Sequence, residues 1–181
     1  MKKTLLIKIA SILPAIFMIL PFYSCEKDNG TGNDKEDNTV SENPIKNIKA
    51  DYSMNFSEDV LKFYDIEVTY GINGKTEKTE SVTKTSWSTS CTYTEKDLPE
   101  SVFCKAVMTP KADRPSIDPE AIYTVTKDKS CSVSAIYKDG KNSVLNIYEN
   151  SSSNPVKGKK FEEYLNKGQQ VVCDYSYSIQ Y

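Results

Sequence analysis

IKADYSMNF, residues 48–56, alternates apolar and polar side chains without a break. Its apolar members are Ile48, Ala50, Tyr52, Met54 and Phe56. A period of two over nine residues is the pattern of a β-strand with one face in a core. Residues 63–70, FYDIEVTY, repeat it, with Tyr64, Ile66, Val68 and Tyr70 on the inward face. These two stretches predict a protein built from half-buried strands.

Two turn signals connect predicted strands. Asn73-Gly74 lies between two extended runs, and both residue types tolerate the positive φ that a tight hairpin needs. The strand that follows, from Lys75 onward, is rich in Thr, Ser and Glu, so we expect it at a sheet edge or facing solvent. A second turn, at Asp139-Gly140, leads into residues 143–148, SVLNIY.

Residues 87–108 predict a second hairpin. Apolar and polar side chains alternate on both sides of the loop TEKDLPES, residues 94–101. An antiparallel register about this loop joins inward-facing residues in every pair. The predicted pairs are Trp87 with Met108, Thr89 with Ala106, Cys91 with Cys104 and Tyr93 with Val102.

The C-terminal half continues with strands and one helix. Residues 121–127, AIYTVTK, and 130–137, SCSVSAIY, predict two strands after a proline-containing loop. Residues 156–168 predict a helix, because Phe161, Tyr164 and Leu165 share one face and Gly168 follows as a stop signal. The last strand places one set of residues on its inward face: Val171, Cys173, Tyr175, Tyr177, Ile179 and Tyr181.

These elements define the expected fold. About eight short strands and one short helix near the C-terminus predict an all-β fold, an antiparallel β-sandwich that is immunoglobulin-like in the broad sense. A closed β-barrel is the alternative.

The N-terminus predicts an export signal. Residues 1–24 combine Lys2, Lys3 and Lys8 with an apolar run over residues 9–20 and end in the small residue Ser24. That run is shorter than the roughly 20 residues that a membrane-spanning helix needs. The segment is therefore expected to be a cleaved signal and not a permanent membrane helix.

The residues PFYSC, 21–25, resemble the lipobox of bacterial lipoproteins, and the tract CEKDNGTGNDKED that begins at Cys25 resembles the acidic export tract of Bacteroidetes surface lipoproteins. With the strand-rich region that follows, the whole chain resembles the small β-sandwich lipoproteins of unassigned role in that group. The resemblance implies that Cys25 is acylated and holds the protein in the outer membrane, facing the cell exterior. Acyl chains at one point are sufficient for such an anchor.

The mature chain has two expected parts. Residues 25–44 hold the lipidated cysteine and a flexible acidic tether, because they contain too few apolar side chains to build a core. Residues 45–181 form a single β-sandwich domain. Without residues 1–24 the chain carries 20 Lys and Arg against 25 Asp and Glu, a net charge of −5. That balance argues against nucleic acid or anionic lipid as a partner.

Four cysteines remain beyond Cys25, and two interpretations stay open. Cys91, Cys104, Cys131 and Cys173 form two disulfides, as is common in exported proteins, or they are buried thiols that pack as small apolar residues. Cys91 and Cys104 face each other in the predicted hairpin, so they are the first candidate pair. A zinc site is not expected, because no two of these cysteines are closely spaced and the chain has no histidine.

The sequence offers little catalytic chemistry and no cofactor motif. The absence of histidine excludes Ser-His-Asp and Cys-His catalysis. Gly74-Lys75-Thr76 lacks the first glycine of a phosphate-binding loop. Five carboxylates could serve glycoside hydrolysis, but a solvated face is the simpler interpretation: Asp65, Glu67 and Glu80 on outward faces, and Asp118 and Glu120 on a loop. We therefore expect a protein that is not an enzyme.

Two binding functions remain. In the first, the protein docks onto another envelope protein through a sheet edge or through the loops at residues 111–120 and 149–159. In the second, it is a glycan-binding accessory of a polysaccharide uptake system. A patch with two or more exposed aromatic side chains favours the second function, and buried aromatic side chains favour the first.

Overall fold

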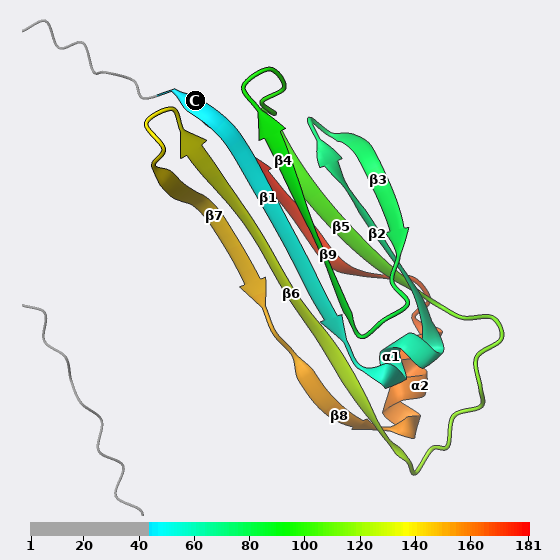
Figure 1. The fold of residues 1–181 in the computed structure, drawn as a ribbon. Coiled ribbons are helices and arrows are strands. Elements are labelled where there is room, and N and C mark those ends of the chain that lie inside the picture. The colour runs from blue at the N-terminus through cyan, green and yellow to red at the C-terminus, as the bar shows by residue number, and fades with distance from the viewer. Residues whose placement is uncertain (1–43) are drawn as a thin grey trace, which may run out of the picture. The chain divides into compact units, whose positions relative to one another are not determined.

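The computed structural model describes residues 44–181, which form nine strands and two helices (Figure 1). The predicted signal peptide at residues 1–24, the anchor Cys25 and the tether up to residue 43 lie outside the described residues. Sheet A contains β1 (Ile45–Phe56), β4 (Ser86–Thr94), β6 (Ile122–Tyr137), β7 (Asn142–Asn150) and β8 (Ser153–Lys157). Sheet B contains β2 (Tyr64–Ile72), β3 (Lys75–Ser81), β5 (Ser101–Pro110) and β9 (Gln170–Ser178). The helices are α1 (Glu58–Phe63) and α2 (Gly158–Asn166).

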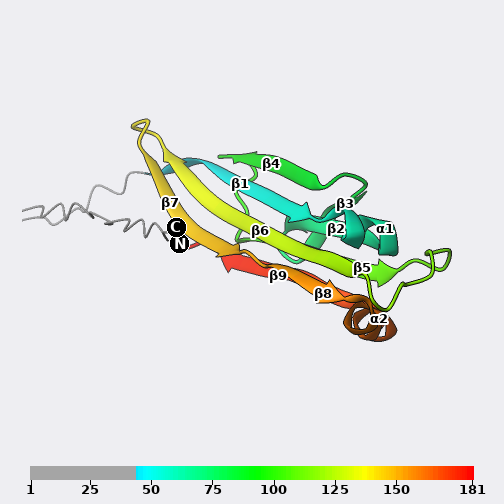
Figure 2. The same cartoon turned by 90° about the horizontal axis from the view of Figure 1, so that it is seen from below.

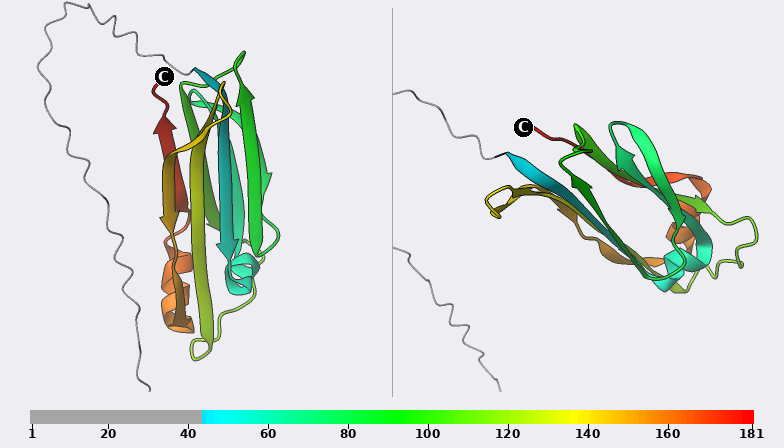
Figure 3. Two further views of the ribbon diagram at one scale, coloured as in Figure 1. Left: turned by 60° about the vertical axis from the view of Figure 1, so that its left-hand side comes forward. Right: turned by 45° about the horizontal axis from the view of Figure 1, so that its top comes forward.

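The two sheets pack face to face as a β-sandwich, which confirms the predicted fold class (Figures 2 and 3). Sheet A has the order β4-β1-β6-β7, and β8 continues along β6 beyond β7. Sheet B has the order β3-β2-β5-β9, and all pairings in both sheets are antiparallel. Both helices lie at the same end of the sandwich (Figure 1).

The core follows the alternation of the sequence. Every predicted inward residue of β1 is 0–2 % exposed, and those of β2 are at most 4 % exposed. β1 and β2 lie in opposite sheets and each has a strand on both sides, so their inward faces meet in the middle of the core. Their burial supplies the main driving force for closing the sandwich.

The turn predictions are also confirmed. Asn73 has φ 53° and Gly74 has φ 71° between β2 and β3, as a two-residue hairpin requires. β3 pairs only with β2 and lies at the edge of sheet B, as its polar composition predicted. Gly140, with φ 86°, turns the chain from β6 into β7.

The predicted hairpin between residues 87 and 108 is wrong. β4 pairs with β1 in sheet A, whereas β5 lies between β2 and β9 in sheet B. Residues 95–100 therefore cross from one sheet to the other. Alternation identifies the inward face of a strand but not its neighbour, and both strands present inward faces that fit either arrangement.

The helices show one confirmed prediction and one omission. α2 buries Phe161 and Leu165 and is followed by Gly168 at φ 71°, as predicted. α1 was not predicted, since six residues are too few for a periodic pattern. Its start carries a recognisable signal, because the Ser57 side chain accepts a hydrogen bond from the Val60 N–H at 3.4 Å.

β6 and β9 depart from prediction in detail. The two strands predicted over residues 121–137 are one strand of 16 residues. In β9 the inward face begins at Val172 rather than Val171, which is 57 % exposed, because an irregularity opposite Ala106 and Val107 shifts the register by one residue. Tyr181 lies beyond the strand and is 66 % exposed.

Candidate functional site

A carboxylate network joins the two sheets where the edge strands β3 and β4 meet. Glu80 of β3 accepts a hydrogen bond from the Tyr70 hydroxyl at 2.8 Å and from the Trp87 indole N–H at 2.9 Å. Glu77 accepts one from the Tyr93 hydroxyl at 2.8 Å. We call these five residues, Tyr70, Glu77, Glu80, Trp87 and Tyr93, the carboxylate seam.

A bulge places Glu80 in this seam and corrects the prediction that it faces outward. Tyr70 pairs with Lys78 and Gly71 with Thr76, so Glu77 is an extra residue in β3. The extra residue reverses the side-chain parity beyond it, and Glu80 lies opposite the inward-facing Val68. Gly71 is required here, because a Cβ atom would approach the Lys75 carbonyl oxygen to 2.1 Å. A glycine inside a strand was the signal that could have predicted the bulge.

The electrostatics of the seam favour an ionised Glu80. Hydrogen bonds from Lys78, Trp87 and Tyr70 lower the pKa of Glu80 to about 2. Burial and the hydrogen bond to Glu77 raise the pKa of Tyr93 above its ordinary value. Trp87 and Tyr93 of sheet A donate to carboxylates of β3 in sheet B, so the network ties the two edge strands together.

The opposite side of the sandwich brings β7 of sheet A beside β9 of sheet B (Figure 2). The Tyr175 hydroxyl donates to the Asn146 side-chain oxygen at 3.1 Å, and the Tyr148 and Tyr175 rings stack with centroids 6.0 Å apart. Outside these contacts β7 exposes apolar side chains: Val144 is 62 % and Ile147 is 59 % exposed.

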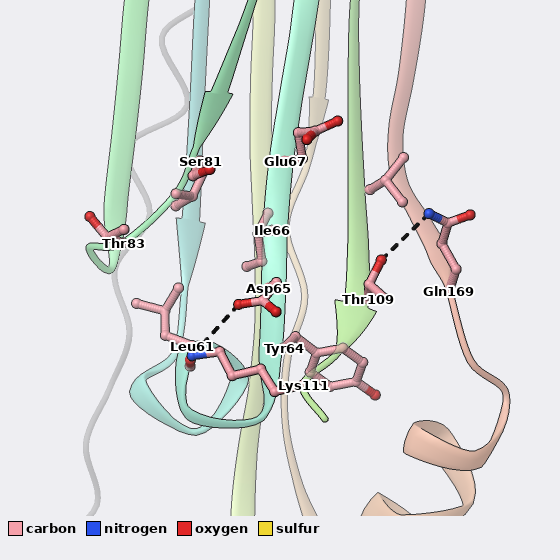
Figure 4. Close-up of a pocket in the computed structure, with 12 residues that line it drawn as sticks. Leu61, Tyr64, Asp65, Ile66, Glu67, Ser81, Thr83, Thr109, Lys111 and Gln169 are labelled. Atoms are coloured by element: carbon pink, nitrogen blue, oxygen red, sulfur yellow. Dashed lines mark hydrogen bonds and ion pairs between the residues drawn. The ribbon is translucent and has the colours of Figure 1, made fainter. Parts of the chain in front are cut away.

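A hollow of about 420 Å³ lies on the outer face of sheet B and contains two carboxylates that the sequence singled out (Figure 4). Asp65 and Glu67 project from β2, and the Lys111 ammonium lies 4.0 Å from the Asp65 carboxylate. The Asp65 side chain is 76 % exposed. A general acid in glycoside hydrolysis needs a desolvated carboxyl group, and Asp65 lies in water.

The loop carboxylates are engaged in local structure. The Asp118 carboxylate accepts a hydrogen bond from the Glu120 backbone N–H at 2.9 Å, which shapes the turn before β6. Glu120 forms an exposed ion pair with Lys157 at 3.4 Å. The structure brings neither residue together with Asp65, Glu67 or Glu80.

The outer face of sheet A is lined with small hydroxyl side chains. Ser53 of β1 lies between Ser88 of β4 and Ser130 of β6. With Ser90 and Ser132 these residues line an open hollow of about 380 Å³. Such a surface offers hydrogen bonds to many polar ligands and specificity for none.

Three of the four domain cysteines meet in the core. Cys104, Cys131 and Cys173 are at most 1 % exposed, and the Sγ atoms of Cys131 and Cys173 are 3.9 Å apart across the two sheets. The Cys173 thiol donates a hydrogen bond to the Cys104 carbonyl oxygen at 3.7 Å. All four cysteines are free thiols in this structure. The predicted register that paired Cys91 with Cys104 is wrong, since their strands lie in different sheets.

The buried hydroxyl of Tyr52 lies beside this cysteine cluster without a hydrogen-bond partner. Burial raises the pKa of Tyr52, and the neighbouring Cys104 raises it further. The ring packs between Tyr70 and Tyr175, with centroid distances of 6.0 and 6.3 Å. Tyr52 therefore fills the core as an aromatic side chain.

Comparison of the chain with protein-family models, curated proteins and solved structures gives no match. None of the helices in residues 44–181 is long and apolar enough to cross a membrane. No group of three or more His, Cys, Asp or Glu side chains in this described part could hold a metal ion.

Proposed function

We propose that this chain is a lipoprotein anchored in the outer membrane through Cys25, and that it docks to another envelope protein without catalysing a reaction. The anchor and the outward-facing location rest on the export signal, the Ser24-Cys25 box and the acidic tract. The docking role rests on one feature of the domain, the edge strand β7.

β7 supports the proposal because it is a nine-residue edge strand that exposes apolar side chains. It pairs only with β6, so the other side of its backbone carries unpaired hydrogen-bonding groups over nine residues. It contains no Lys, Arg or Pro, and it exposes Val144 and Ile147. Such an edge can receive an extended segment of another protein as an additional strand.

The other edge strands, β3, β4, β8 and β9, are less suited to this role, and β8 is short and contains Pro155. β3 carries Lys75, Glu77, Lys78 and Glu80, and charges on an edge discourage strand addition. β4 exposes serine and threonine on its outer face and contributes Trp87 and Tyr93 to the carboxylate seam. β9 has a register shift, as β7 does, but it exposes one large apolar side chain, Val171, where β7 exposes three.

The aromatic side chains support docking over glycan binding. Of the exposed large hydrophobic residues in the described part, only Tyr148 and Tyr181 are aromatic. Tyr148 lies opposite Cys131 on β6, and Tyr181 lines a hollow with Tyr137, six residues further along β6. Six residues of strand separate the two rings by about 20 Å, too far for one sugar ring to contact both.

The test is crosslinking of the native lipidated protein on its own cells, followed by capture and mass spectrometry. We expect one or two protein partners in near-stoichiometric yield. The variant Ile147→Lys places a charge on the β7 edge and should abolish their recovery. Val171→Lys is the matched control, because Val171 is equally exposed but lies on β9.

Each outcome decides the proposal. Loss of the partner with Ile147→Lys alone supports docking through β7. Equal recovery with both variants rejects β7 as the site. Recovery of no partner from wild-type cells rejects the docking function, and a glycan-binding screen then tests the alternative.

A further inference from the structure

Two lysines occupy core-facing positions of β6. The odd-numbered residues of this strand point between the sheets: Val125, Cys131, Val133 and Ala135 are 0–9 % exposed. Lys127 and Lys129 have the same parity and lie opposite Phe56 and Met54 of β1, which are also buried. A local break in an otherwise consistent apolar pattern is expected where a protein binds something.

Lys129 is explained by the fold. Its ammonium donates a hydrogen bond to the Val172 carbonyl oxygen of β9 at 2.5 Å and lies 5.5 Å from the centre of the Tyr148 ring. Lys129 therefore links sheet A to sheet B across the seam between them, and its charge is satisfied by a carbonyl group and an aromatic face.

Lys127 has no such partner. No carboxylate or carbonyl oxygen of residues 44–181 accepts a hydrogen bond from its ammonium. Burial lowers the pKa of Lys127, and the charges of Lys129 and Lys167 lower it further. Asp128, the next residue of β6, accepts hydrogen bonds from Ser151 and Ser152. Glu163 lies near Lys167 but pairs with Lys160 at 2.7 Å. We call Lys127, Lys129 and Lys167 the lysine seam.

A hollow of about 250 Å³ opens beside Lys127, between β6, β8, α2 and the start of β9. Its polar lining residues are Lys127, Ser152, Asn154, Tyr164, Lys167 and Gln170. Lys167, whose ammonium lies 5.3 Å from the centre of the Tyr164 ring, lines the same hollow. The volume is below the roughly 300–1,000 Å³ of pockets for drug-sized ligands, so a small group fits.

We propose that this hollow binds an oxyanion, a phosphate, sulfate or carboxylate group, through the ammonium groups of Lys127 and Lys167. The anion would supply a counter-charge for Lys127 that no residue of 44–181 provides, and a partly buried ammonium without one is costly. Asn154 and Tyr164 line the hollow as neutral donors that can complete the shell of hydrogen bonds around the oxygens. This site is separate from the β7 edge and does not depend on the docking function.

The first experiment titrates the full-length protein in detergent with inorganic phosphate, at constant pH and ionic strength, and follows backbone amide resonances. Shifts should concentrate at residues 125–127, 152–156 and 164–170, with a dissociation constant of about 1 mM, the affinity that two charge-assisted hydrogen bonds provide. Lys167→Gln should weaken binding at least tenfold. Absence of shifts, or shifts spread evenly over the surface, would overturn the proposal.

The second experiment separates binding from a structural role of Lys127. Lys127→Met keeps the apolar stem and removes the unpaired charge. It should abolish the phosphate response and raise the melting temperature in phosphate-free buffer by about 3 °C. Lys84→Met, at an exposed position between β3 and β4, is the matched control. It should change neither the phosphate response nor the melting temperature. A lower melting temperature with an unchanged phosphate response would show that Lys127 is structural and overturn the site.

A further arm of the titration identifies the source of the anion. Acetate and glucuronate carry the same carboxylate, free or on a sugar. Tighter binding of glucuronate than of acetate assigns the site to an acidic saccharide, and tighter binding of phosphate assigns it to a phosphate group. Failure of all three anions to bind would overturn the proposal.

Discussion

The two long sides of the sandwich differ in how the charged side chains at their borders are balanced. Each side brings an edge strand of sheet A against an edge strand of sheet B, and each places charged side chains at the border of the core. In the carboxylate seam, Glu77 and Glu80 accept hydrogen bonds from Tyr70, Trp87 and Tyr93, and Lys78 balances the charge of Glu80. In the lysine seam, Lys127 and Lys167 line a hollow with Lys129 nearby, and Lys127 has no hydrogen-bond partner among residues 44–181.

This difference distinguishes a border that only closes the sandwich from a border that can also bind a ligand. Charges that the chain satisfies itself stabilise the border and exclude further ligands, whereas a charge left unsatisfied beside a hollow is available to bind one. β8 and α2 contribute Asn154 and Tyr164 to the hollow of the lysine seam, and both elements lie at the same end of the sandwich (Figure 1). Four changes test the comparison, from the largest expected effect to the smallest.

Truncating the aromatic side chain that packs α2 against the sandwich should have the largest effect on the free energy of unfolding. Phe161 of α2 is 1 % exposed, and its ring centroid lies 4.8 Å from that of Tyr123 and 5.1 Å from that of Phe63. Phe161→Ala should lower the free energy of unfolding by about 3–5 kcal/mol, because it empties this aromatic cluster. Urea denaturation measures the loss, with the half-exposed Tyr148→Ala as the control. A loss below about 1 kcal/mol would mean that α2 is not firmly docked.

The cysteines on the two sides of the sandwich should differ in whether they form a disulfide on oxidation. Cys131 and Cys173 face each other near the lysine seam, whereas Cys91 lies on β4 near the carboxylate seam. Refolding in a glutathione redox buffer should link Cys131 to Cys173 and raise the free energy of unfolding by about 2–4 kcal/mol. Peptide mapping without reduction identifies the link, and Cys91→Ala should leave it intact. A disulfide that contains Cys91 would contradict the packing described above.

The contribution of the carboxylate seam to the free energy of unfolding should decrease in acid. Glu80→Gln should lower the free energy of unfolding at pH 7 by about 1–2 kcal/mol, because the hydrogen bonds from Tyr70, Trp87 and Lys78 lose their charged acceptor. The pKa of Glu80 is lowered in the folded state, so its contribution is present above pH 4.5 and is lost as the pH falls toward 2.

Urea unfolding of Glu80→Gln and the wild type between pH 7 and pH 2.5 measures this contribution. The difference between the two proteins should shrink with acid. Glu67→Gln, on the outer face of β2, should show no such trend. A difference that is constant with pH would exclude an ionised Glu80 as the stabilising group.

The smallest effect should come from the core between the two seams. Tyr52→Phe removes a buried hydroxyl that has no hydrogen-bond partner, so it should leave the free energy of unfolding unchanged or raise it by up to about 1 kcal/mol. Tyr70→Phe is the comparison, because it removes the bond to Glu80 and should destabilise by a similar amount. A clear loss with Tyr52→Phe would reveal a partner for its hydroxyl.

The sequence by itself determined the local and periodic features of the domain. Alternation over residues 48–56 and 63–70 identified the buried faces of β1 and β2, Asn73-Gly74 identified a hairpin, and Phe161 with Gly168 identified α2 and its end. These features depend on side chains within a few residues of one another, because strand and helix periods are properties of the local chain.

Only the tertiary structure decided which strands are neighbours and which polar side chains turn inward. β4 joins β1 rather than β5 because alternation does not specify a partner. The bulge beside Gly71 turns Glu80 into the carboxylate seam, and the paired positions opposite Met54 and Phe56 turn Lys129 and Lys127 toward the core. A one-residue shift or a distant strand changes the surroundings of a side chain without changing its local sequence, so these sites emerge only when the sheets pack.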